Sequence, residues 1–90
     1  MKPTHDVAYI WNDLGVVYIN NNDHNGAFEA FKKAVSVDSA NTNSLKNLGI
    51  VYALCGVEQG IAHVHQMLSK LDVKAAKDFL VKAQQILSNR

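Results

Sequence analysis

The sequence predicts an all-α protein in which about five helices pack as antiparallel pairs. Apolar residues recur at the i, i+3, i+4, i+7 spacing of a helix along nearly the whole chain. Clusters of Asn, Asp, Ser and Gly interrupt that spacing at intervals, and the only proline is Pro3, so no helix is broken from within. Part of the first apolar segment also recurs 34 residues further along the chain. These three observations together favour a stack of helix pairs over any fold that contains strands.

The apolar stripes and the polar clusters between them define the expected helices. These helices span residues 5–20, 24–37, 42–54, 57–71 and 73–88. Four residues stand where a short side-chain oxygen can accept hydrogen bonds from the free N–H groups of a helix start, namely Thr4, Asp23, Asn41 and Asp72. Gly56 can end the third helix in a left-handed conformation. Because the connections are short, neighbouring helices must run antiparallel.

The repetition is specific in residue type as well as in spacing. The segment from Trp11 to Tyr18 aligns with the segment from Leu45 to Tyr52. The recurring residues are Leu14, Gly15, Val17 and Tyr18, which return as Leu48, Gly49, Val51 and Tyr52. A fixed period of this length is typical of a helical solenoid, in which each helix pair needs a neighbour to cover its apolar face.

This pattern resembles the tetratricopeptide repeat, whose signature is W-x2-L-G-x2-Y followed by A-x3-F-x2-A. Residues 8–41 carry it as Trp11, Leu14, Gly15, Tyr18, Ala27, Phe31, Ala34 and Asp38. The resemblance implies one domain over residues 1–90, folded as a short right-handed α-solenoid. Repeat one would cover residues 8–41, repeat two residues 42–75, and a closing helix residues 76–88.

The second repeat departs from the family pattern along its second helix. Ile61 and Leu68 stand where small alanines are usual, and His65 stands where an aromatic residue is usual. In the first repeat, Gly15 lets its two helices approach closely because it has no side chain. We therefore expect a large side chain at Gly15 to force the first pair apart.

The bulk composition excludes several classes of function. Hydrophobic residues make up 48% of the chain, charged residues 19%, and the formal net charge is +1. So small a charge provides no general attraction to nucleic acid or to an anionic membrane. No apolar run has the length needed to cross a bilayer. We expect neither a nucleic-acid partner nor membrane association.

The single cysteine and the start of the chain bear on where the protein works. Cys55 cannot form an internal disulfide, which fits a reducing compartment. Residues 1–6 are polar and do not resemble a signal peptide. We expect a cytoplasmic protein, and Met1 together with the polar end at residues 88–90 favours a complete chain.

The residue pattern predicts no catalytic residues, no metal centre and no cofactor. His63 and His65 are two positions apart on one expected helix, so they point to different sides and cannot share a metal ion. Cys55 has no acid or base at a recognisable spacing, and Gly56 and Gly60 lie outside any strand–loop–helix setting that would cradle a phosphate. We therefore expect a binding protein rather than an enzyme.

The resemblance implies a concave groove, lined by the first helix of each pair, that binds a peptide or helix of a partner protein. It places that groove on Tyr9, Asn12, Asp13, Val16, Asn20, Asn43, Lys46, Asn47, Ile50, Lys77, Leu80 and Gln84. Asparagine amides can pair with the donors and acceptors of a peptide backbone. Lys46 and Lys77 can hold an acidic group. The alternative is that these residues have no binding role and form the solvated face of a solenoid.

A second hypothesis is self-association through the fourth and fifth helices, which would make the protein a structural or assembly subunit. The departures at Ile61, His65 and Leu68 are consistent with a surface that pairs with another copy. The closing helix adds further apolar residues, namely Leu80, Val81 and Leu87. The oligomeric state in solution separates this hypothesis from the groove.

Overall fold

The computed structural model describes the backbone of residues 4–89 and the side chains of residues 7–89, and these residues form five α-helices. The helices are α1 (Thr4–Asn20), α2 (His24–Val37), α3 (Thr42–Cys55), α4 (Glu58–Leu71) and α5 (Val73–Ser88). No strand occurs among the described residues. The predicted all-α class and the five expected helices are confirmed.

The helix ends agree with the expected bounds to within one residue. The first helix begins at Thr4, the third continues to Cys55, and the fourth begins at Glu58. Val57, which we expected inside the fourth helix, is instead the residue that precedes it, with φ −93° and ψ 90°. The cause is the turn at Gly56, which leaves the chain in a left-handed conformation one residue before Val57.

Side-chain caps fix three of the four helix starts for which we expected one, and the side chain of Thr4, the fourth, lies outside the described residues. Carboxylate or amide oxygens of Asp23, Asn41 and Asp72 accept hydrogen bonds from backbone N–H groups three residues further on, at 2.9, 3.1 and 3.1 Å. Gly56 ends α3 with φ 74°. In the same turn, the N–H group of Val57 donates to the carbonyl of Tyr52 at 2.8 Å. Sequence-local chemistry therefore determines where these helices begin and end.

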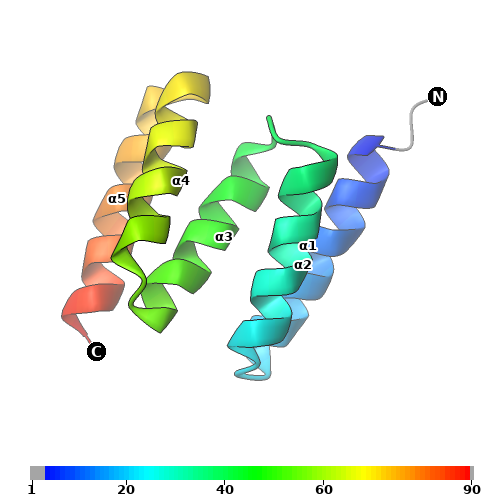
Figure 1. The fold of residues 1–90 in the computed structure, drawn as a ribbon, viewed down its shortest axis with the longest axis horizontal. Helices are drawn as coiled ribbons and strands as arrows, with labels where there is room; N and C mark the ends of the chain where they lie inside the picture. Colours follow the sequence, from blue (N-terminus) through cyan, green and yellow to red (C-terminus); the bar gives the residue numbers. More distant parts are fainter. Residues whose placement is uncertain (1–3, 90) are drawn as a thin grey trace.

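The five helices form a flat stack with α3 at its centre (Figure 1). Its principal extents are 43 × 31 × 17 Å. Helix α3 contacts each of the other four helices, whereas within the described residues neither α1 nor α2 reaches α4 or α5. The first pair, α1 and α2, lies at one end of the stack, and α4 with α5 lies at the other (Figure 1). This is the neighbour-to-neighbour packing of a solenoid.

Gly15 and Gly49, which occupy the same position of the two repeats, both lie where helices approach closely, but different helices pack against them. A methyl group at Gly15 would collide with the ring of Phe31, which comes from α2. A methyl group at Gly49 would collide with the ring of Phe79, which comes from α5, and would press on Val64 of α4. Thus the aromatic side chain that covers the second glycine is supplied by the closing helix. This explains why position 65 of α4, where the first repeat has Phe31, does not need a phenylalanine.

The structure corrects one ground of the self-association hypothesis. Ile61 and Leu68 are buried inside the protein, in the same apolar cluster as Val64 and Phe79. Their size fills the space between α4 and its neighbours, which smaller side chains would leave empty. Two of the three departures from the repeat pattern are therefore core residues, and they cannot form a pairing surface.

Candidate functional site

The residues predicted for the groove lie on α1, α3 and α5 and differ in exposure. Those exposed to solvent are Tyr9, Asp13, Val16, Asn20, Asn43, Lys77 and Gln84. Those that are half-buried are Asn12, Lys46, Asn47, Ile50 and Leu80. The half-buried residues are the ones placed between helices, and four of them lie on α1 or α3.

A hydrogen bond joins the first and third helices on this side of the stack. The amide nitrogen Nδ2 of Asn47 donates to Oδ1 of Asn12 at 2.9 Å, between residues 35 positions apart in the chain. Each side-chain amide has both donor and acceptor capacity, so Nδ2 of Asn12 and Oδ1 of Asn47 keep their own capacity for another partner. The structure therefore brings these two predicted residues together as one polar pair.

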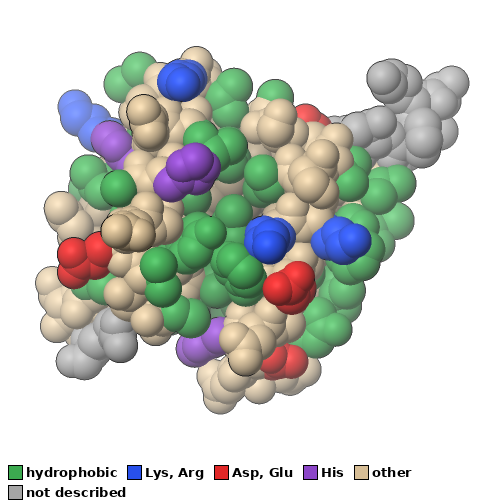
Figure 2. All heavy atoms as spheres, viewed as in Figure 1, with side chains coloured by type: hydrophobic (Ala, Val, Ile, Leu, Met, Phe, Trp, Pro, Cys, Tyr) green, Lys and Arg blue, Asp and Glu red, His purple; other side chains and the backbone are tan. Residues whose placement is uncertain are grey.

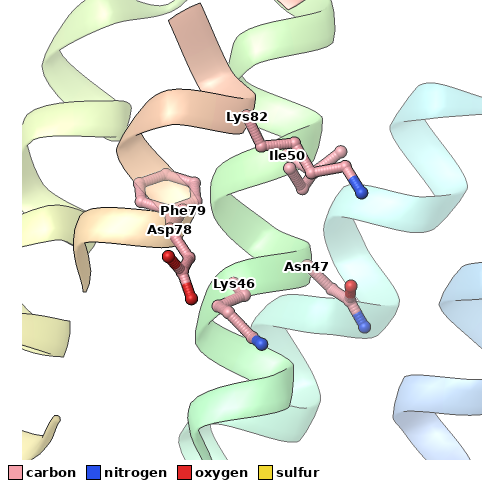
Figure 3. A pocket seen from close by; sticks show the side chains of 6 residues that line it. All are labelled: Lys46, Asn47, Ile50, Asp78, Phe79 and Lys82. Carbon is pink, nitrogen blue, oxygen red and sulfur yellow. The ribbon is translucent and has the colours of Figure 1, made fainter. Parts of the chain in front are cut away.

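A cavity of about 280 Å³ lies next to this pair, between α3 and α5. Its lining consists of Lys46, Asn47, Ile50, Asp78, Phe79 and Lys82. Figure 3 shows the three side chains of α3 beside the three of α5. The predicted residues from α3 are thus gathered in one place, whereas Lys77, Leu80 and Gln84 of α5 are not among the lining residues.

Sequence reasoning missed Asp78, Phe79 and Lys82 for a physical reason. The expected α5 residues were transferred by 34 positions from α3, which assumes that α5 sits on α3 as α3 sits on α1. Instead, α5 packs the ring of Phe79 directly against Gly49, which brings Asp78 and Lys82 to the cavity. The one available signal was the i, i+4 spacing of an acid and a base around that aromatic residue.

The first helix pair, α1 and α2, matches a known protein family. Residues 8–41 match the family model of the tetratricopeptide repeat. With the five-helix stack, this fits a tetratricopeptide-type protein. No curated protein and no solved structure matches the chain. Because the tetratricopeptide fold is generally a non-catalytic fold for protein–protein interaction, the repeat supports an interaction module with protein partners.

The cavity between α3 and α5 combines positive charge with apolar carbon surface. Lys46 and Lys82 contribute two ammonium groups and Asp78 one carboxylate, so its formal charge is +1. Phe79 is buried and Ile50 half-buried, and both offer carbon surface. An acidic group that lies next to an apolar group on a ligand would find complementary chemistry here.

A second cavity of about 270 Å³ lies where α2, α3 and the turn after α3 meet. It is lined by His24, Asn25, Phe28, Val51, Tyr52, Cys55 and Val57. The rings of Phe28 and Tyr52 pack edge to face there, with centroids 5.4 Å apart. Figure 2 shows hydrophobic side chains exposed on this side of the molecule, between α2 and α4. Cys55 is a free, exposed thiol.

Neither a metal centre nor a membrane-spanning helix occurs in the part of the chain that the structure describes. Among the described residues, no group of three or more His, Cys, Asp or Glu side chains is arranged to hold a metal ion. In the same part of the chain, no helix combines the length and the apolar character that spanning a bilayer requires.

Proposed function

We propose that this tetratricopeptide-type protein binds a segment of a partner protein, carrying an acidic group, on the face made by α1, α3 and α5. The observation that supports this proposal is the convergence of Lys46, Asn47 and Lys82 around the carbon surface of Ile50 and Phe79. The residues come from two helices that are far apart in sequence, so the fold brings them together.

Each part of the site has a distinct role in the proposed complex. The ammonium groups of Lys46 and Lys82 attract the acidic group, and Asp78 sets its orientation by repelling it from one side. The pair formed by Asn12 and Asn47 offers an amide donor and acceptor to the backbone of the bound segment. The other predicted groove residues, Tyr9, Asp13, Val16, Asn20, Asn43, Lys77, Leu80 and Gln84, extend the surface along the three helices.

The proposal treats the chain as one binding unit with repeat one at residues 8–41, repeat two at residues 42–75 and a closing helix at residues 76–88. A contact that recurs with the 34-residue period supports the second repeat. Gly26 packs against the ring of Tyr18 in the first pair, and Gly60 packs against the ring of Tyr52 in the second. The unit acts without catalysis or cofactor, and its free thiol at Cys55 suits a reducing, cytoplasmic setting.

A quantitative pull-down tests the site. We expect the double variant K46A/K82A to retain its partner about tenfold less well than the unaltered protein, because both ammonium groups that attract the acidic group are lost. We also expect the Asn12→Ala and Asn47→Ala variants to bind less partner. Lys74→Ala is the matched control, since Lys74 is an exposed lysine of α5 outside the cavity.

The salt dependence of binding provides a second readout. Raised salt should weaken binding to the unaltered protein and should have less effect on K46A/K82A, because the lost contacts are the charged ones. If the partner binds K46A/K82A and the asparagine variants as well as the unaltered protein, the α3–α5 cavity is not the binding site.

The alternative function is self-association through the fourth and fifth helices. It now rests on Leu71 at the end of α4 and on Val73 and Val81 of α5, all of which are exposed apolar residues. Leu80 and Leu87 are half-buried within the chain. Light scattering at rising protein concentration decides between the two proposals: a monomer at high concentration contradicts self-association and leaves the groove proposal standing.

A further inference from the structure

Four apolar side chains of α1 form a continuous exposed stripe at one end of the stack. They are Val7, Ile10, Leu14 and Val17, named the α1 stripe below, and all four are exposed. Their 3-4-3 spacing places them on one side of the helix. Figure 2 shows hydrophobic side chains along the edge that α1 forms. A row of this kind is more than the scattered apolar residues that any protein surface carries.

The second repeat shows what environment these positions normally have. Leu14 is 37% exposed and its equivalent Leu48 only 7%. Val17 is 52% exposed and its equivalent Val51 only 1%. The chain therefore repeats the same apolar residues at the same repeat positions, but only the second set is covered.

One further pair of equivalent positions sharpens the contrast. Ile10 is 64% exposed, while Ser44, which is 34 residues later, is 0% exposed. The apolar residue stands in the open position and the polar one in the covered position. The exposed surface of α1 is thus more apolar than the covered surface that it matches.

The covering element in the second repeat is α2, which packs against α3. It contributes Phe31 to the apolar cluster that holds Leu48 and Val51, and its Phe28 ring packs on Tyr52. Because consecutive helices run antiparallel, α2 lies antiparallel to the helix that it covers. Among the described residues, no helix covers the same surface on α1.

We propose that the α1 stripe docks an amphipathic helix of a partner chain, with an aromatic and aliphatic face, lying antiparallel to α1 as α2 lies antiparallel to α3. This surface is separate from the groove, because the stripe residues and the lining of the α3–α5 cavity have no member in common. The proposal therefore holds whether or not the groove binds an acidic segment.

Charge defines the docked helix further. Among the described side chains of α1, Asp13 supplies a carboxylate and none is a lysine or arginine. A helix with lysine or arginine beside its apolar face is therefore complementary to α1. Helix α2 has this composition, with Lys32 and Lys33 next to its aromatic residues, and it already places Lys33 over the ring of Trp11 at 5.9 Å.

A second copy of this chain offers its own exposed α1 stripe, but that helix carries no lysine or arginine and so lacks the complementary charge. The aromatic face of its α2 already packs against its own α3. The exposed apolar residues of its α5, Val73 and Val81, are eight positions apart, with Lys77 between them. A partner chain that presents a free amphipathic helix fits the stripe better than another copy does.

The test uses the sequence of α2 as its probe, because α2 covers the equivalent surface within this protein. A helix-stabilised peptide of residues 23–38 is titrated into the ¹⁵N-labelled full-length chain, and amide chemical shifts are followed. We expect the largest shifts at Ile10, Leu14 and Val17. The variant I10S/V17S should bind the peptide about tenfold more weakly, because two anchors of the apolar contact are removed.

Val57→Ser provides the matched control, since Val57 is an exposed valine just before α4, outside both the stripe and the groove, and should leave the peptide affinity within about twofold. Circular dichroism shows that each variant remains folded. Four results overturn the proposal. They are chemical shift changes that centre on Leu48 and Val51, peptide binding that I10S/V17S does not change, a stripe-dependent dimer of this chain that I10S/V17S dissociates, and an absence of chemical shift changes at millimolar peptide.

Discussion

Individual residues show how strongly the neighbours of a position decide its environment. Ser44 lies in the first turn of α3 and is fully buried, and its hydroxyl oxygen Oγ has no hydrogen-bond partner within the described residues. Its backbone N–H group, by contrast, donates to the side chain of Asn41 at 3.1 Å. The backbone of Ser44 is therefore satisfied, while its side chain carries the cost of an unpaired buried polar group.

We expect Ser44→Ala to raise the free energy of unfolding by about 1 kcal/mol, because it removes an unpaired buried hydroxyl and introduces a better helix former. Denaturant titration measures the change. Ser69→Ala is the control, since the Ser69 hydroxyl donates to the carbonyl of His65 at 2.8 Å and its removal should bring no gain. A loss of stability in Ser44→Ala would show that its hydroxyl has a partner in solution.

Helix pairs are the next scale, and their geometry depends on close approach at glycines. In the first pair Gly15 of α1 meets Phe31 of α2. Phe31 is fully buried, so its ring has no free space to move into. The helix ends are set separately, by Asp23, Asn41, Asp72 and Gly56. Capping thus determines the length of each helix, and the glycine determines how near its partner lies.

We expect Gly15→Leu to lower the free energy of unfolding by about 3 kcal/mol, because the new side chain would overlap the ring of Phe31 and force α1 and α2 apart. Thermal unfolding followed by circular dichroism measures the loss. Val16→Leu is the neighbouring control on an exposed face of α1, and it should change stability by less than about 0.5 kcal/mol. An unchanged melting curve for Gly15→Leu would contradict this packing.

The whole molecule is held together through α3, because it alone contacts both ends of the stack. The closing helix α5 packs on α3 and α4, and its Phe79 covers Gly49. It thereby does two things at once: it completes the core of the second pair and it brings Asp78 and Lys82 to the candidate site. The same packing of α5 on α3 therefore closes the stack and completes the lining of the candidate site.

We expect Phe79→Ala to lower the free energy of unfolding by about 3–5 kcal/mol, because it leaves a cavity over Gly49. Hydrogen exchange should quicken in α3, α4 and α5 more than in α1 and α2, because stability in a solenoid is transmitted between neighbours. Val81→Ala, at an exposed position of the same helix, should change neither quantity appreciably. Uniform loss of protection over all five helices would contradict this neighbour-limited behaviour.

The sequence predicted the candidate-site residues on α3 but not those on α5. Lys46, Asn47 and Ile50 were expected from their repeat positions on α3, and the structure gathers them at one cavity. Their α5 companions were expected at Lys77, Leu80 and Gln84, but the cavity is lined by Asp78, Phe79 and Lys82. Repeat position transfers well only where the packing of the neighbour is itself repeated.

The sequence by itself determined the helices, their caps and the repeat, because these depend on interactions within a few residues and on a 34-residue period that is visible in the chain. Only the tertiary structure decided which equivalent residues are covered. Leu14 and Leu48 are the same residue at the same repeat position, yet one lies at an open end and the other under α2. Burial depends on what packs next to a position, and no local pattern contains that information.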